Sequence, residues 1–259
     1  MSTGSLSGRG ALVTGVGRRV GIGYAISRRL LESGASVFAH AWTPYDVQAY
    51  EVAPDEADAV LSGLRETGGR VEQFQADFAE PDAPAELFAA AREAFEHVDI
   101  LVVNHTRSSH APLEELTAEH LDDCLHENVR ASLLLVKEFA AQHDGREGGR
   151  VVLMTSGQHI APMAGEVAYA VSKGALHQAT KTLAEALIDG GITVNTVNPG
   201  PTDTGWGIGD VDPKPAMPLG RWGEPDDAAR LIAWLCTDDA RWITGQVIDS
   251  EGGFRRWAR

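Results

Sequence analysis

The sequence has few cysteines, few basic residues for its length and no long apolar run. Its two cysteines, Cys124 and Cys236, fall within amphipathic stretches, so neither a disulfide framework nor a metal site is expected. The 22 Lys and Arg residues stand against 37 Asp and Glu, and a formal net charge of −15 argues against a nucleic-acid partner, which requires a basic surface. No apolar run approaches the roughly 20 residues of a membrane span, so no membrane partner is expected.

Residues 1–9 are rich in Ser and Gly and lack the apolar core of a signal peptide, which predicts a disordered leader and a cytoplasmic protein. Between residues 10 and 259 no linker, repeat or shift in composition divides the chain, so one domain is expected over 10–259. A segment rich in Gly, Pro and Asp at about 203–218 interrupts the pattern of this domain.

Short apolar runs alternate with longer amphipathic stretches along the whole domain. The runs predict β-strands, and the stretches predict helices that cross from one strand to the next. Such units build a parallel sheet with helices on both faces, so the expected fold is a single-domain, doubly wound α/β sheet of the Rossmann type, with about seven strands. The expected strands are 11–13, 36–39, 71–75, 100–103, 150–154, 192–197 and 246–248, and the expected helices are 24–32, 56–67, 85–96, 116–142, 167–188 and 225–236.

Glycines are concentrated between the first expected strand and the first expected helix. Glycine lets the backbone approach a pyrophosphate closely, and the free N–H groups at the start of a helix attract its negative charge. In a doubly wound sheet, ligands bind beyond the carboxyl ends of the strands. The segment therefore predicts a dinucleotide site that includes Gly15, Gly17, Gly21, Ile22 and Gly23.

The end of the second expected strand bears on the choice between NAD(H) and NADP(H). Enzymes that prefer NAD(H) usually carry an acid here for the ribose 2′-hydroxyl, but this strand runs into Trp42 and the nearest acid is Asp46. Arg18 and Arg19 are instead placed to bind a 2′-phosphate through charge-assisted hydrogen bonds. The sequence favours NADP(H), with NAD(H) as the alternative, and places Trp42 at the adenosine end of the cofactor.

Tyr169 and Lys173 lie four positions apart in an expected helix and therefore share one face. The phenol of tyrosine has a reference pKa of about 10, and a nearby ammonium group favours the tyrosinate form and lowers that pKa. Ser156, just after an expected strand, is placed to bind a substrate oxygen. The three side chains predict acid–base chemistry at a carbonyl or an alcohol.

Ser156, thirteen residues before Tyr169, resembles together with Lys173 the catalytic set of the short-chain dehydrogenase/reductase family, and the resemblance spans Gly10 to Phe254. It implies that Asn128 holds a water in a proton relay. Other positions match the cofactor-binding segments of the family. Asp77 matches the acid that binds adenine, with Phe78 beside it, and Asn104 matches the segment after the fourth expected strand. The glycine motif is matched by Thr14, Gly15, Gly21 and Gly23, and the segment beneath the nicotinamide by Pro199, Gly200, Thr202 and Thr204.

Two departures from the family pattern concern the cofactor end. Five residues separate Gly15 from Gly21 where the family usually has three, which is similar to bacterial reductases of the 3-oxoacyl carrier-protein reductase-like subgroup. The Asn-Asn-Ala-Gly segment of the family is replaced by Val103–Thr106, whose larger side chains we expect to crowd the cofactor ribose.

The resemblance implies that Ser156 and Tyr169 bind the carbonyl oxygen, that Tyr169 donates a proton as the nicotinamide donates hydride, and that Lys173 binds the nicotinamide ribose. A small-molecule ketone is the favoured substrate, and a 3-oxoacyl thioester on a carrier protein or CoA is the alternative. Carrier proteins are acidic, and Glu185 stands where related carrier-protein reductases often have a basic residue. The candidate substrate contacts are Gln158, His159, Met163, Trp206 and Ile208, and the 203–218 segment is the expected substrate lid.

Two other functions share this fold. Enoyl reductases generally place Tyr and Lys seven positions apart, not four as here, and non-catalytic nucleotide-sensing proteins often lose one of the two. The expected helices 116–142 and 167–188 carry more Ala and Leu than one core-facing stripe needs. We therefore expect a homotetramer, or a dimer, formed through these helices, as the family commonly shows.

Overall fold

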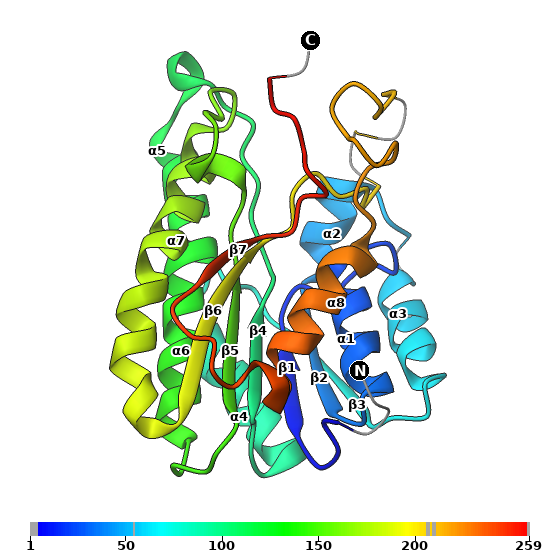
Figure 1. The fold of residues 1–259 in the computed structure, drawn as a ribbon, viewed down its shortest axis with the longest axis vertical. Coiled ribbons are helices and arrows are strands. Elements are labelled where there is room, and N and C mark those ends of the chain that lie inside the picture. The colour runs from blue at the N-terminus through cyan, green and yellow to red at the C-terminus, as the bar shows by residue number, and fades with distance from the viewer. Residues whose placement is uncertain (1–4, 54, 206–207, 209–210, 258–259) are drawn as a thin grey trace.

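The computed structural model describes residues 5–53, 55–205, 208 and 211–257. Seven strands of this part form one parallel sheet in the order β3-β2-β1-β4-β5-β6-β7 (Figure 1). This confirms the expected doubly wound sheet, and the order reverses between β1 and β4. The strands are β1 Gly10–Val13, β2 Ser36–Ala41, β3 Val71–Gln75, β4 Ile100–Val103, β5 Gly149–Met154, β6 Ile192–Asn198 and β7 Val247–Asp249.

Helices cover both faces of the sheet, with α1, α3 and α8 on one side and α4, α6 and α7 on the other (Figure 1). Successive side chains of a strand point to opposite faces, so Ala11 and Val13 join one buried apolar cluster and Leu12 joins the other. The helices are α1 Ile22–Glu32, α2 Thr43–Tyr50, α3 Glu56–Arg65, α4 Ala83–Phe95, α5 Ala118–Asp123, α6 Ala131–Gln142, α7 Val167–Leu187 and α8 Pro225–Leu235. No described helix is both long enough and apolar enough to cross a membrane.

Two helical regions differ from the sequence prediction. The expected helix 116–142 is not uniform, because a π-helical stretch, Cys124–Arg130, separates α5 from α6. The short helix α2 was not expected, since it buries no residue and so lacks the apolar stripe of a core-facing helix. Both features lie next to the candidate active site described below.

The start of the chain also differs from the prediction of a disordered leader over residues 1–9. Leu6 is fully buried in the cluster of α1 and α8, and its backbone N–H donates a hydrogen bond to the Ser33 carbonyl at 2.8 Å. Residues 5–9 therefore belong to the folded domain, because one apolar side chain within a polar segment is enough to attach it to the core. Residues 1–4 lie outside the described part.

Candidate active site

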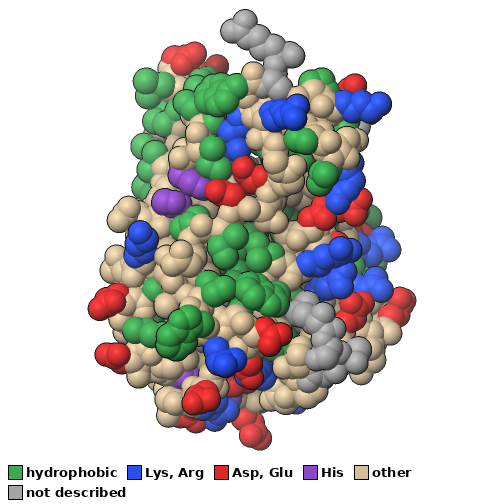
Figure 2. All heavy atoms as spheres, in the orientation of Figure 1, with side chains coloured by type: hydrophobic (Ala, Val, Ile, Leu, Met, Phe, Trp, Pro, Cys, Tyr) green, Lys and Arg blue, Asp and Glu red, His purple; other side chains and the backbone are tan. Residues whose placement is uncertain are grey.

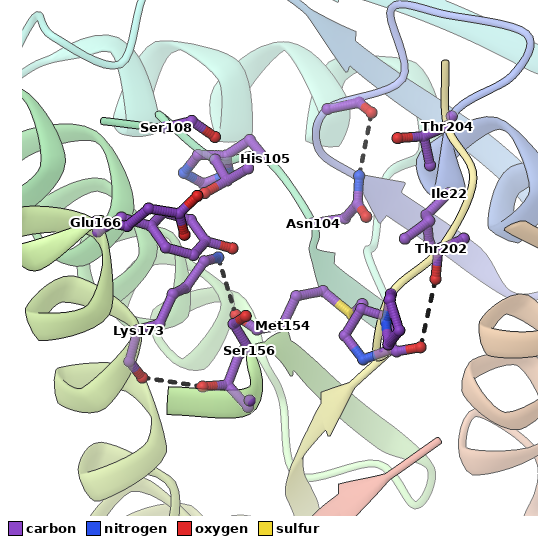
Figure 3. A pocket seen from close by; sticks show the side chains of 18 of the residues that line it. Ile22, Asn104, His105, Ser108, Met154, Ser156, Glu166, Lys173, Thr202 and Thr204 are labelled. Atoms are coloured by element: carbon purple, nitrogen blue, oxygen red, sulfur yellow. Dashed lines mark hydrogen bonds between the residues drawn. The ribbon is translucent and has the colours of Figure 1, made fainter. Parts of the chain in front are cut away.

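A cleft of about 700 Å³ opens at the carboxyl ends of the strands, beside the point where the strand order reverses. Its size falls in the usual range for small-molecule and cofactor sites. Figure 3 shows side chains from the glycine segment, the end of β4, the end of β5, helix α7 and the segment after β6 converging on it. Of the predicted site residues, those that line the cleft are Gly15, Gly17, Arg18, Gly21, Ile22, Trp42, Phe78, Asn104, Ser156, Met163, Tyr169, Lys173, Pro199, Gly200, Thr202, Thr204 and Ile208.

The three predicted catalytic side chains meet at one end of the cleft. Ser156 follows β5, and Tyr169 and Lys173 lie on the first turns of α7. The Lys173 ammonium donates a hydrogen bond to the Met154 carbonyl at 3.1 Å and lies 5.8 Å from the centre of the Tyr169 ring (Figure 3). The Thr155 hydroxyl donates to the Lys173 carbonyl at 3.0 Å, so β5 and α7 are joined directly beneath the reacting groups.

The acidities of these groups differ from the prediction. Burial raises the pKa of Tyr169 to about 12, and the Ser156 and Thr106 hydroxyls act in the opposite direction through hydrogen bonding. Burial also lowers the pKa of Lys173 to about 8. Spacing along a helix shows that an ammonium group is near, but not how far both groups are removed from water. Tyr169 is therefore a neutral phenol at pH 7, in the protonation state needed to donate a proton.

Asn128 lies in the π-helical stretch and is fully buried behind the cleft. Its amide donates to the Arg107 carbonyl and to the Ser172 hydroxyl, both at 2.9 Å, and its carbonyl oxygen accepts from the Arg107 N–H at 2.6 Å. The side chain thus connects the segment after β4 to α7. A relay water on Asn128 stays a prediction, since the side-chain groups already bind protein atoms.

Two histidines that the sequence analysis did not assign to the site attach the glycine segment to the sheet. The Nδ1 of His105 lies 2.8 Å from the Thr14 hydroxyl and its Nε2 lies 2.9 Å from the Glu127 carbonyl. Because that carbonyl can only accept, Nε2 carries the proton and Nδ1 accepts from Thr14. The Nδ1 of His40 accepts from the Gly15 N–H at 3.3 Å, and its Nε2 donates to the Ala76 carbonyl at 2.9 Å.

Both imidazoles are neutral, because burial lowers the pKa of His40 to about 4 and that of His105 to about 3. His105 stands in the segment expected to crowd the cofactor ribose. It lines the cleft, but it also packs at a tilt against Phe78, with 4.3 Å between ring centres. Part of the bulk of His105 therefore serves to support the glycine segment, a role that sequence spacing alone does not reveal.

The glycine segment fits the pyrophosphate of a dinucleotide. Gly15 has a φ of +72°, and a side chain there would clash with the His105 backbone at 2.8 Å. Helix α1 begins after Gly21 with no side-chain cap and no acid in its first turn, so its free N–H groups are available to phosphate oxygens. Asn104 fixes the segment from below, since its amide donates to the carbonyls of Thr14 and Gly15 at 3.0 and 3.1 Å (Figure 3).

The two arginines of this segment have different surroundings. Arg18 lines the cleft, stacks on the Tyr50 ring of α2 at 3.6 Å, and lies 3.9 Å from the carboxylate of Asp46. Arg19 points away from the cleft and pairs with Glu56 of α3, with 3.1 Å between charged atoms. Only the first of the pair is therefore placed to meet a cofactor phosphate.

Helix α2 brings an acid to the adenosine end that the strand pattern did not predict there. Asp46 lines the cleft and presses against the backbone of Gly17, and burial raises the pKa of its carboxyl to about 6. Tyr45 of the same helix crosses to the segment after β4, where its hydroxyl accepts from the Ser108 N–H at 3.3 Å. A helix predicted over 43–50 would have located both residues at the cleft.

The substrate end contains some predicted contacts and some unexpected ones. Met163 and Ile208 line the cleft, whereas Trp206 lies outside the described residues. Gln158 and His159 do not line it, because Gln158 binds the Thr155 hydroxyl and His159 pairs with Asp249 and stacks on His177. The C-terminal residues Phe254, Arg256 and Trp257 were missed, and they form part of the wall.

Four predicted cofactor residues do not line the cleft: Thr14, Gly23 and Asp77, and Arg19, which pairs with Glu56 as described above. Thr14 and Gly23 are packed beneath the glycine segment, and the Asp77 carboxylate accepts from the Ala79 N–H at 2.9 Å. Adenine binding by Asp77 stays a prediction. The described residues that were predicted for the site but do not line the cleft are Thr14, Arg19, Gly23, Asp77, Asn128, Gln158 and His159.

Comparison with known proteins supports the same assignment. The family model described as enoyl-(acyl carrier protein) reductase matches residues 15–255. The uncharacterised oxidoreductase YjdA of Bacillus subtilis is 38% identical over 250 residues, which covers 95% of this chain and 96% of that protein. The hydroxynaphthalene reductase-like protein Arp2 of Metarhizium majus is 34% identical over 274 residues, which covers 96% of each chain.

The crystal structure of a short-chain dehydrogenase from Burkholderia cenocepacia in complex with NADP has 37% sequence identity and a TM-score of 0.85, and the match covers 96% of this chain and 98% of that chain. These similarities extend over the whole domain and agree with the set of Ser156, Tyr169 and Lys173 in one cleft. The chain is therefore an NAD(P)-dependent oxidoreductase and belongs to the short-chain dehydrogenase/reductase family.

Proposed function

We propose that this protein uses NADPH to reduce a free, partly apolar ketone to an alcohol. The observation that carries the proposal is the position of the Tyr169 phenol, which lies in the cleft wall with Ser156 on one side and the buried Lys173 beneath it. Apolar side chains of Met163, Ile208 and Phe254 line the cleft as well.

The chain's own residues handle the proton of the reaction. The hydroxyls of Ser156 and Tyr169 donate hydrogen bonds to the substrate carbonyl oxygen, which orients the carbonyl and stabilises the negative charge that develops on it. Tyr169 then transfers its proton to that oxygen, and general acid catalysis of this kind contributes about 10²–10⁴-fold. When bound, the nicotinamide would supply the hydride for the carbonyl carbon. The Lys173 ammonium stabilises the tyrosinate that remains, and it would also hold the nicotinamide ribose.

The preference for NADPH rests on Arg18. Its guanidinium lies at the cleft surface of the glycine segment, and a 2′-phosphate is the cofactor group that a guanidinium binds best. The Burkholderia relative in complex with NADP supports the same choice. The residues that would hold the rest of the cofactor are those of the glycine segment, Phe78 and Asn104 at the adenosine half, and 199–204 beneath the nicotinamide.

A free ketone is favoured over a carrier-protein thioester for two reasons. The acidic net charge of the chain disfavours an acidic carrier protein. The relative named hydroxynaphthalene reductase-like protein also points to a compact cyclic substrate. We further propose association through the segments 116–142 and 167–188, where Leu133 of α6 and Val171 of α7 are exposed apolar side chains.

The test is oxidation of NADPH and of NADH, measured separately by absorbance, against a panel of cyclic ketones, β-keto esters and acyl thioesters. We expect turnover of cyclic ketones with NADPH at a kcat/KM at least about tenfold above that with NADH. Turnover confined to acyl thioesters would replace the proposed substrate class. Turnover with no carbonyl compound and with neither cofactor would contradict the proposed reaction.

A further inference from the structure

Glu166 places a carboxylate beside the reacting phenol. It precedes the first residue of α7 and lies three positions before Tyr169, so both side chains emerge on the same side of the helix start. Figure 3 shows Glu166 extending from α7 into the cleft above Lys173. The side chain is 19% exposed, so most of its hydration is already lost before a substrate enters.

The other charged side chains that line the cleft are compensated by opposite charges or serve the chemistry. Arg18 lies beside Asp46, and Arg256 pairs with Glu251 through both of its terminal nitrogens. Glu127, also at the cleft, lies 3.7 Å from Arg107. A carboxylate substrate would therefore have to displace an existing ion pair to obtain a guanidinium partner at the substrate end.

Glu166 differs from these groups in its partner. The group opposite it is the imidazole of His110, with Nδ1 3.0 Å from the carboxylate, and that side chain is 57% exposed. The carboxylates of Asp46 and Glu127, in contrast, lie beside guanidinium groups, whose positive charge is permanent, so Glu166 is the one of the three that presents its negative charge to a substrate. The same charge acts on the Tyr169 phenol, where it disfavours the tyrosinate.

We infer that Glu166 determines substrate specificity by charge, so that this cleft favours ketones carrying an ammonium or hydroxyl donor near the carbonyl and rejects ketones carrying a carboxylate. The inference rests on the proposed ketone reduction. A substrate that fills the cleft removes the remaining water from Glu166, and a buried carboxylate is destabilised unless a donor replaces that water. A donor on the substrate supplies the missing hydrogen bond, whereas a second carboxylate adds repulsion where water is excluded.

The experiment compares three matched acetophenones that carry a CH₂NH₃⁺, CH₂OH or CH₂CO₂⁻ group in the meta position, with NADPH at pH 7.5. We expect kcat/KM to fall in that order, with the ammonium compound at least about tenfold above the carboxylate. In Glu166→Gln the ratio should fall to within about threefold of one, and Glu166→Asp, which keeps the charge, should retain the order. If acetophenones are not reduced but another ketone is, the same order is measured as competitive inhibition of that reaction.

Glu93→Gln is the matched control, because it removes the same charge from an exposed position on α4 that does not line the cleft. This variant should keep the wild-type ratio, which separates a local effect from a change in net charge. Equal values for the three compounds in the wild type, or a ratio unchanged in Glu166→Gln, would overturn the inference. Loss of reduction of every ketone in the wild type would instead count against the proposed function.

Discussion

The two ends of the cleft are built in different ways. At the catalytic end, main-chain groups of β5 and α7 fix Lys173, and Tyr169 lies on a helix of 21 residues that packs along the sheet. At the adenosine end, side chains of the glycine segment meet the eight-residue helix α2, none of whose residues is fully buried.

Figure 2 shows one outer face of the molecule, where Lys and Arg side chains lie among Asp and Glu rather than in one basic patch.

This difference between the two ends suggests distinct roles: the end with Tyr169 and Lys173 for the proton transfer, and the adenosine end for the choice of cofactor. The groups proposed for the chemistry are held between β5 and α7, so removing one should abolish a step that no neighbour can replace. The adenosine end depends on exchangeable side-chain contacts, so changes there should alter which cofactor binds and leave the proton transfer intact. Three sets of variants test this contrast, from the largest expected effect to the smallest.

Tyr169→Phe should lower kcat by at least about a hundredfold, because the proton donor is removed while the ring that lines the cleft is kept. NADPH binding, followed by its fluorescence, should change little. The matched control is Tyr45→Phe, which deletes the same hydroxyl at the adenosine end, where it accepts from the Ser108 N–H. A kcat that falls equally in both variants would remove the distinction between the two ends.

Arg18 and Arg19 offer a comparison between neighbours in the sequence. Arg18→Gln should raise the KM for NADPH by about tenfold, equivalent to about 1.4 kcal/mol, with a much smaller effect on NADH. Arg19→Gln should change neither value by more than about twofold, because its guanidinium is exposed and already paired with Glu56. Steady-state kinetics with both cofactors decide this, and equal effects of the two substitutions would show that neither residue reads the 2′-phosphate.

The sequence was sufficient for the fold because apolar runs of strand length recur with helices between them, and each expected strand is present within about two residues. The meeting of Ser156, Tyr169 and Lys173 in one cleft was also predictable, since Tyr169 and Lys173 share a helix and Ser156 directly follows a strand. In each case the relevant spacing is local, so a helix or a strand end converts it directly into a position.

The residues that were missed depend on contacts between distant segments. His40 reaches the glycine segment across adjacent strands, and Arg256 returns from the C-terminus to the end of β5, where it lies against Gly157. No residue of helix α2 is fully buried, so its sequence gives no amphipathic signal. Without that helix, neither Asp46 nor Tyr50 could be placed at the cofactor cleft.

Asp46 gives the smallest expected effect and the finest test of the adenosine end. Burial raises the pKa of its carboxyl from 3.8 to about 6, so the group is charged at pH 7.5 and mostly neutral at pH 5.5. The charged form lies 3.9 Å from Arg18 and opposes a 2′-phosphate placed there. Asp46→Asn should therefore tighten NADP⁺ binding about three- to tenfold at pH 7.5 and weaken NAD⁺ binding slightly, as titration calorimetry can measure.

The pH dependence of the same binding constants separates the carboxyl from the phosphate. Lowering the pH to 5.5 protonates Asp46, which favours NADP⁺, but it also protonates the 2′-phosphate, whose second pKa is about 6, and this weakens its attraction to Arg18. Asp46→Asn retains only the phosphate effect, so NADP⁺ binding by the variant should weaken more steeply as the pH falls than binding by the wild type. Identical pH profiles would show that the Asp46 charge does not reach the phosphate. Weaker NADP⁺ binding by the variant at pH 7.5 would show that Asp46 instead positions Arg18 for it.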